Sequence, residues 1–230
     1  MEERNLTVCI PTKNRESILS LELASLVKYK DLISKTIILN TGEPFCGEEL
    51  KQMFGIMEQE EMVLEIYVKP LQLLEAREFL WSKVETKHLW MMDDDMFISM
   101  PLKDLQGCLN LLEMYDVVGF MVPNGTPPKE VTEEFVDKFH RTKQTTLIKP
   151  DGPERMIGGI YLVNTKVDGL TFKNELKPDE PGEDRLLFEN VRKKVLCTKA
   201  FAYHMTSKKI GSNFDYQRYF GEENMMWKDK

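Results

Sequence analysis

The sequence lacks any long apolar run, and no stretch approaches the ~20 apolar residues that a membrane-spanning helix needs. Its start, Met1 to Arg4, has neither the basic opening nor the apolar core of a secretory signal peptide. Cysteine is scarce: the four cysteines are scattered and form no C-x-x-C pair. Repeats and low-complexity segments are absent as well. These absences predict a soluble, cytoplasmic protein with reduced, structural cysteines, and argue against a secreted disulfide scaffold.

What the sequence does have is the composition of an ordinary globular domain. Its 230 residues are 42% hydrophobic, which suits one α/β domain with a sizeable core. The net charge of −7 argues against a general nucleic-acid binder. The charge is uneven, because residues 185–230 carry ten Lys or Arg against five Asp or Glu. This basic segment could meet an anionic substrate or lipid headgroups, or it could be an ordinary solvated surface.

Apolar runs typical of strands alternate with segments of helical period through residue 122. We predict strands over residues 6–10, 36–39, 62–68, 87–92 and 117–122. We predict helices over residues 17–29, 48–59, 73–84 and 102–115. This alternation indicates a parallel sheet with helices on both faces, in which the ligand crevice lies at the carboxyl ends of the strands.

The pattern becomes irregular after residue 122. We predict a loop over residues 124–128, a charged helix over 131–141 and a strand led by glycines over 158–163. A helix start with acidic residues follows at 182–184, and a final strand pair at 195–203. The last strand leads directly into His204. The sequence predicts a single domain over residues 1–230, with an α/β nucleotide-type half and a more irregular second half.

Three consecutive carboxylates, Asp93 to Asp95, are the most informative feature of the sequence. Adjacent negative charges repel one another, and burying them without partners costs free energy. A hard divalent cation removes this cost, because Mg²⁺ and Mn²⁺ take carboxylate oxygens as ligands. In an extended chain Asp93 and Asp95 face one site while Asp94 faces another. The alternative is a solvated acidic turn after a strand.

Five short motifs resemble, in their order, family 2 of the glycosyltransferases and its close relatives. They are the strand and turn 8–15 (VCIPTKNR), the pair Ala76-Arg77, the triplet Asp93–Asp95 at the place of a metal-binding DxD, the Glu-Asp segment Gly182–Arg185, and His204. The resemblance implies the GT-A fold of nucleotide-diphospho-sugar transferases. That fold is a Rossmann-like α/β arrangement, with a mixed, mostly parallel sheet flanked by helices.

The resemblance also implies an enzyme, a metal-dependent glycosyltransferase. It would move a sugar from a nucleotide-diphosphate donor, by default a UDP-sugar, to a hydroxyl acceptor. Mn²⁺ or Mg²⁺ would be bound by Asp95, Asp93 and His204, and would stabilise the charge that builds on the departing diphosphate. Asp184, or its neighbour Glu183, would take the proton of the acceptor hydroxyl. A base opposite the leaving group would give inversion at the anomeric carbon.

The implied donor contacts come from the first half of the chain: Pro11, Thr12, Lys13, Asn14, Arg15, Asn40, Arg77, Asp93 and Asp94. Lys13 and Arg77 would pair with donor phosphates or with the aspartates themselves. One residue departs from the family pattern. The second strand usually ends with an acidic residue that helps to hold the donor base, and here it ends with Asn40. An amide can still hydrogen-bond a base or a ribose, so the identity of the base stays open.

The resemblance divides the single domain by function. Residues 5–122 would form the nucleotide-sugar-binding half, residues 123–205 the acceptor-binding and catalytic half, and residues 206–230 a C-terminal tail. Acceptor choice would depend on the irregular segment 123–181 and the tail. The acceptor therefore stays open among a glycan, a lipid-linked precursor, a protein and a modified nucleobase in DNA.

Two other classes of function remain. A sugar-nucleotide nucleotidyltransferase also combines an α/β sheet with Mg²⁺ and carboxylates, but it typically opens with a Gly-rich phosphate loop, and residues 11–14 contain no glycine. The other class is a non-catalytic nucleotide-sugar-binding module of the same fold. Single residues also have plainer roles: Arg77 can pair with Glu75 or Glu78 on its own helix, and His204 can be a structural histidine.

Overall fold

The computed structural model describes residues 4–121, 147–148, 159–167, 191 and 193–204. Four predictions fall outside these residues, namely those for 124–128, 131–141, 182–184 and the tail 206–230. Among the helices of the described residues, none combines the length and the apolar character that crossing a bilayer requires.

Strands and helices alternate through the first half of the chain, as the sequence predicts. The strands are β1 (Leu6–Thr12), β2 (Ile33–Asn40), β3 (Leu64–Val68), β4 (His88–Met92), β5 (Met96–Ile98), β6 (Val117–Met121), β7 (Leu147–Ile148), β8 (Ile160–Asn164) and β9 (Lys194–His204). The helices are α1 (Glu16–Leu26), the 3₁₀ turn η1 (Val27–Tyr29), α2 (Glu48–Gln59), α3 (Leu73–Trp81) and α4 (Leu102–Leu111).

The strands form one mixed sheet in the order β3-β2-β1-β4-β8-β6-β9-β5, and β7 pairs with β9 outside this path. Strands β1, β2, β3, β4, β6 and β9 run in one direction, and β5, β7 and β8 run against them. The sheet is therefore mixed and mostly parallel, as predicted. The carboxyl ends of β1, β2 and β4 meet at one edge, where Thr12 lies opposite Asn40.

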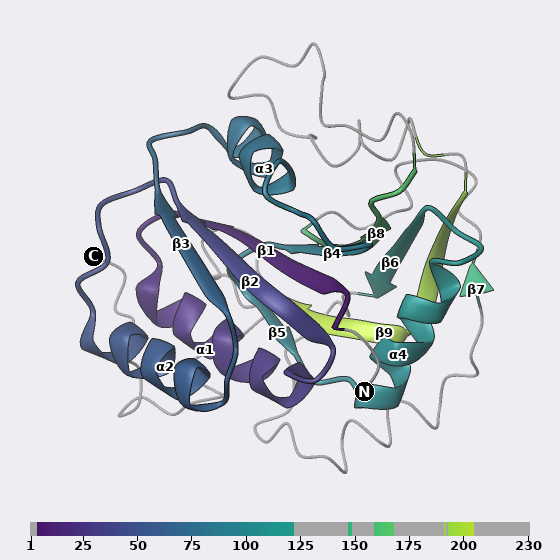
Figure 1. The fold of residues 1–230 in the computed structure, drawn as a ribbon, viewed down its shortest axis with the longest axis horizontal. Coiled ribbons are helices and arrows are strands. Elements are labelled where there is room, and N and C mark those ends of the chain that lie inside the picture. Colours follow the sequence, from purple (N-terminus) through teal and green to yellow (C-terminus); the bar gives the residue numbers. More distant parts are fainter. Residues whose placement is uncertain (1–3, 122–146, 149–158, 168–190, 192, 205–230) are drawn as a thin grey trace.

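Helices cover both faces of the sheet (Figure 1). The side chains of β1 alternate between two apolar clusters: Val8 and Ile10 join the cluster under α1, α2 and α4, whereas Cys9 joins the cluster under α3. Burying one large apolar side chain stabilises the fold by roughly 1.5–3 kcal/mol. Packing on both faces therefore holds β1 and its neighbours firmly in place.

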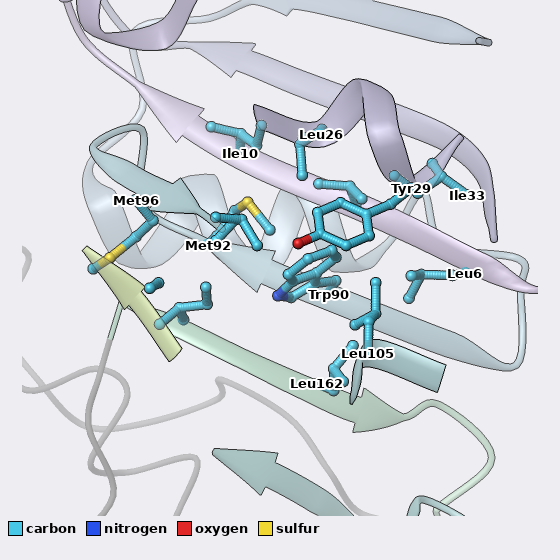
Figure 2. Packing of buried hydrophobic residues seen from close by; sticks show 14 of the residues in the cluster. Leu6, Ile10, Leu26, Tyr29, Ile33, Trp90, Met92, Met96, Leu105 and Leu162 are labelled. Atoms are coloured by element: carbon cyan, nitrogen blue, oxygen red, sulfur yellow. The ribbon is translucent and has the colours of Figure 1, made fainter. Parts of the chain in front are cut away.

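Trp90 anchors the centre of the larger cluster, as Figure 2 shows. Its indole meets the Tyr29 ring edge-on at 5.9 Å between centroids and stacks on Phe120 at 5.7 Å. The Tyr29 hydroxyl, which is buried with the ring, donates a hydrogen bond of 2.6 Å to the carbonyl of Met100. These contacts fix β4, so that the aspartates directly after it start from a rigid strand.

The last strand corrects one prediction. Residues 195–203 do not form a strand pair, because β9 is one continuous strand. Its first part pairs in parallel with β6, a register shift follows, and Ala202 to His204 pair with β5. Strand β5 itself was not predicted, because three residues after an acidic turn carry too short a pattern. The pairing places the backbone of His204 opposite Met96, next to the aspartate triplet.

Smaller differences concern the ends of elements. β1 continues through Pro11 to Thr12, although the sequence predicts a strand over residues 6–10 only. Strand β4 pairs with β1 only as far as Cys9, so Pro11 lies where β1 has lost one neighbour and a missing N–H is tolerated. Helices α3 and α4 end three and four residues earlier than predicted.

Candidate functional site

The aspartate triplet forms the tight connection between β4 and β5. The N–H of Asp93 donates to the carbonyl of Gly159 at 2.6 Å, and the N–H of Met96 donates back to the carbonyl of Asp93 at 3.3 Å. Asp94 and Asp95 are buried, at 4% and 2% exposure. The triplet is therefore not the solvated acidic turn that the sequence left as an alternative.

Arg77 supports the triplet from the α3 side of the sheet. Its Nη2 donates to Oδ1 of Asp93 at 2.7 Å, and its Nη1 donates to the hydroxyl of Tyr161 at 3.3 Å. The arginine side chain is only 1% exposed, whereas Asp93 keeps 33%. The prediction that Arg77 pairs with the aspartates is confirmed, and its alternative pairing on the helix surface is wrong.

Arg15 supports the triplet from the end of β1, where Asn14 adopts a left-handed backbone with φ of 55°. Its Nη1 donates to Oδ1 of Asp94 at 2.7 Å and its Nη2 to Oδ2 of Asp95 at 2.6 Å. The Thr12 hydroxyl donates to the second oxygen of Asp94 at 2.6 Å. Burial raises the pKa of Asp94 to about 6, although Arg15 and Thr12 act in the opposite direction.

A cavity of about 310 Å³ opens beside these groups. Its wall combines the aspartates with the end of β1, the loop after β2 and the segment before α3: Pro11, Thr12, Lys13, Arg15, Thr41, Leu71, Gln72, Leu73, Asp93, Asp94 and Asp95. Most of the predicted donor-binding residues are thus brought together at one cavity. Asn14, Asn40 and Arg77 are not among its lining residues.

The two asparagines hold the loop that follows β2. Asn40 is buried; its Nδ2 donates to the carbonyl of Glu43, and its Oδ1 accepts the N–H of Gly42 at 2.9 Å. Oδ1 of Asn14 accepts the N–H of Glu43 at 2.9 Å. This Asx-type turn places Thr41 at the cavity. Direct contact of Asn40 with a donor base stays a prediction.

The carboxylates suit a hard divalent cation, although the described residues contain no group of three His, Cys, Asp or Glu side chains gathered as a metal site. Carboxylate oxygens are the ligands that Mg²⁺ and Mn²⁺ prefer. Gly159, with φ of 83°, keeps room beside Asp93, because a Cβ there would stand 2.6 Å from its Oδ2. Asp93 and Asp95 are therefore the described residues that could hold the predicted ion, and metal binding itself stays a prediction.

Glu22 was missed in the sequence, although it lies close to this charge cluster. It is fully buried on α1, and neither of its carboxylate oxygens has a hydrogen-bond partner in the structure. Burial, and then the charges of the three aspartates, raise its pKa well above the usual range. The burial of Glu22 could have been predicted from the sequence, because Glu22 falls on the helix face that also carries Leu19 and Leu26.

The predicted catalytic base, Asp184 or Glu183, lies outside the described residues, so its role stays a prediction. The side chain of His204 is likewise not described, and only its backbone position beside Met96 is known.

Comparisons with known proteins identify the fold. No protein-family model matches this sequence, and no curated protein sequence matches it. Among solved structures, S. aureus TarS 1–349 in complex with UDP-GlcNAc matches with a TM-score of 0.62 at 15% identity, over 88% of this chain and 59% of that one. A second crystal structure of S. aureus TarS 1–349 matches with a TM-score of 0.61 at 17% identity, over 87% of this chain and 60% of that one.

The mannosyltransferase PcManGT from Pyrobaculum calidifontis, in complex with GDP-Man and Mn²⁺, matches with a TM-score of 0.59 at 10% identity, over 89% of this chain and 58% of that one. The chain thus spans about three fifths of the length of these structures. At such identities the likeness establishes the fold alone. The predicted fold, a GT-A-like mixed, mostly parallel sheet flanked by helices, is confirmed.

Proposed function

We propose that this chain is a metal-dependent glycosyltransferase that transfers a sugar from a nucleotide-diphosphate donor, by default a UDP-sugar, to a hydroxyl acceptor with inversion. One observation carries the proposal: the triplet Asp93–Asp95, of which Asp94 and Asp95 are buried, pairs with two arginines at the carboxyl end of β4 and lines a cavity. Ligands bind at this edge of open α/β sheets. The solved complexes of proteins with a similar fold, one with UDP-GlcNAc and one with GDP-Man and Mn²⁺, support it.

The cavity wall has the chemistry that a nucleotide diphosphate needs. Lys13 and Arg15 supply positive charge for the diphosphate, and Arg15 offers a planar fork of donors. Pro11, Leu71 and Leu73 supply apolar surface for a planar base. In this proposal Asn40 and Asn14 act indirectly, by holding the loop that carries Thr41.

The metal would be held by Asp95 and Asp93, with His204 as the third ligand. When bound, a divalent ion supplies Lewis-acid stabilisation for the negative charge on the departing diphosphate. Arg77 would orient Asp93 through its hydrogen bond, and it keeps its positive charge there because its guanidinium cannot lose its proton near neutral pH. Thr12 and Arg15 keep Asp94 turned toward β1.

The second half of the chain would bind and activate the acceptor. The acceptor oxygen forms a bond to the anomeric carbon, while the bond from that carbon to the diphosphate oxygen breaks. The acceptor proton passes to Asp184, or to Glu183 in its place, and the nucleoside diphosphate leaves. Because attack comes opposite the leaving group, the anomeric configuration inverts. The acceptor is a hydroxyl of a glycan, a lipid-linked precursor, a protein or a modified nucleobase.

A donor screen by thermal unfolding tests this proposal. The protein is heated with Mn²⁺ and a panel of UDP- and GDP-sugars, since a ligand at a hundredfold excess over its Kd stabilises the folded state by ~2.7 kcal/mol. We expect one donor class to raise Tm by about 2–4 °C for each kcal/mol of binding stabilisation. Asp95→Asn should lose the shift, while Asp31→Asn, a control on the exposed side chain of Asp31, should keep it. No shift with any donor would contradict the proposal.

A further inference from the structure

The charges around the triplet are nearly balanced before any ligand arrives. Asp93, Asp94 and Asp95 bring three negative charges, and Arg77 and Arg15 bring two positive ones. Arg15 bridges two carboxylates, Asp94 and Asp95, with separate nitrogens at 2.7 and 2.6 Å. A guanidinium therefore already lies against Asp95, the residue that the proposed function assigns to the metal.

The two arginines differ in their freedom to change partners. Arg77 is 1% exposed, donates a hydrogen bond to Tyr161 as well, and is not among the residues that line the cavity. Arg15 is 31% exposed and lines the cavity itself, beside Lys13. Its side chain reaches from the cavity to the buried Asp95. Of these two arginines, only Arg15 can thus turn from the aspartates toward a ligand in the cavity.

We propose that Arg15 is the resident counter-cation of the triplet: it competes with the divalent ion for Asp95, and it transfers to the diphosphate when the nucleotide binds. This inference rests on the proposed function, and it adds that metal binding and nucleotide binding depend on each other. Metal and nucleotide bind cooperatively, and Arg15 supplies part of the coupling.

The physical reasons are charge repulsion and shared ligands. A carboxylate oxygen that accepts from a guanidinium is a weaker metal ligand, and a divalent ion placed beside that guanidinium is repelled by it. A diphosphate removes both costs, because its oxygens match the guanidinium fork and can accept from it bidentately. By linkage, whatever tightens metal binding through the nucleotide tightens nucleotide binding through the metal by the same factor.

The test measures Mn²⁺ binding directly, by the electron paramagnetic resonance signal of aqueous Mn²⁺. Titrations are run on the full chain alone and with UDP or GDP, and a titration of nucleotide without protein corrects for Mn²⁺ held by nucleotide in solution. The variants are Arg15→Gln and Lys13→Gln. Both remove one positive charge from the same cavity, but only the first removes the contact with Asp95.

We expect Arg15→Gln to bind Mn²⁺ without nucleotide more tightly than the wild type, by a factor in the range of about 5–150 that is typical of coupling between sites. Lys13→Gln should gain less, because it removes only long-range repulsion. The factor by which nucleotide tightens Mn²⁺ binding should fall in Arg15→Gln relative to the wild type. Arg15→Lys, which keeps the charge and loses the fork, should lie between the wild type and Arg15→Gln.

The inference is overturned if Arg15→Gln binds Mn²⁺ no more tightly than Lys13→Gln. If Arg15→Gln does not fold, Arg15→Lys decides, and an affinity for Mn²⁺ equal to that of the wild type overturns the inference. A different result would contradict the proposed function itself. A wild-type protein that binds no Mn²⁺, with or without nucleotide, has no metal site at the triplet, and Arg15 then has no metal ion to compete with.

Discussion

Arg77 and Asp93 form an ion pair in which the arginine is buried and the carboxylate is partly exposed. The guanidinium is 1% exposed and the carboxylate 33% exposed, with 2.7 Å between Nη2 and Oδ1. The pair connects α3 to the residue that directly follows β4. Arg77 thus orients the first aspartate of the triplet without lining the cavity.

Replacing Arg77 with Gln should destabilise the fold and also disorder Asp93. Removing one partner of a fully buried pair typically costs about 3–5 kcal/mol, and we expect about 2–3 kcal/mol here because Asp93 remains partly hydrated. Urea unfolding measures the change. As a control, Arg4→Gln removes a surface arginine whose ion-pair distance is 4.0 Å, and should change stability by less than about 0.5 kcal/mol. Equal losses in the two variants would contradict the role given to Arg77.

Gly159→Ala should disturb the same carboxylate from the opposite side. A Cβ at Gly159 would meet Oδ2 of Asp93 at 2.6 Å, and its φ of 83° strains any L side chain. We expect a loss of about 1–3 kcal/mol in urea unfolding together with weaker Mn²⁺ binding.

Gly55→Ala is the matched control for this glycine. An added Cβ there has no atom within 4 Å, and the residue lies inside α2. The helix should gain about 0.5–1 kcal/mol from alanine. A stabilised Gly159→Ala variant with unchanged Mn²⁺ affinity would show that the space beside Asp93 is not needed.

Asn40→Asp introduces the acidic residue that the glycosyltransferase family resembled by the sequence motifs usually carries at this place. We expect the substitution to weaken nucleotide binding. The carboxylate cannot donate to the carbonyl of Glu43, so the loop that carries Thr41 loses a partly buried hydrogen bond. Leaving a buried polar group unsatisfied costs up to about 1–3 kcal/mol. Calorimetric titration with UDP in the presence of Mn²⁺ measures the effect. Tighter binding by the variant would mean that residue 40 reaches the donor base directly.

Glu22→Gln should change how stability depends on pH. A carboxyl whose pKa is raised on folding holds its proton more tightly in the folded chain. The wild type therefore loses stability as pH rises above 4.5, the ordinary value, toward the raised pKa of Glu22. The slope is up to ~1.4 kcal/mol per pH unit for one proton. Glutamine cannot ionise, so the variant should match the wild type near pH 5 and exceed it in stability at pH 8.

Urea unfolding at several pH values measures this difference. Glu60→Gln, at a surface carboxyl that is 42% exposed, should leave the pH dependence of stability unchanged. If stability depends on pH in the same way in the two variants, the buried carboxyl of Glu22 does not lower the stability of the wild type at high pH.

The strand–helix alternation of the first half was predictable because each element carries its own periodicity. The apolar run before Asp93 and the acids after it also mark the site without any tertiary information. Most of the cavity-lining residues from β1 and β4 follow from the rule that the carboxyl ends of parallel strands share one edge.

What could not be predicted depends on partners distant in sequence. β5 exists because β9 pairs with it, and three residues carry no pattern of their own. The burial of Arg77 depends on Tyr161, 84 positions away, whereas the local sequence offers only Glu75 and Glu78. Asn40 lies where a donor contact was expected, yet its amide is engaged by the following turn.

Release of nucleoside diphosphate from the donor that the thermal screen selects tests the central claim most directly. The rate is measured with Mn²⁺, after EDTA, after restoring Mn²⁺, and in Asp95→Asn. Metal-dependent donor activation at the triplet predicts that UDP or GDP appears without pyrophosphate, that EDTA abolishes the release, that Mn²⁺ restores it, and that Asp95→Asn stays inactive. An undiminished rate in EDTA, or a fully active Asp95→Asn, would contradict the claim.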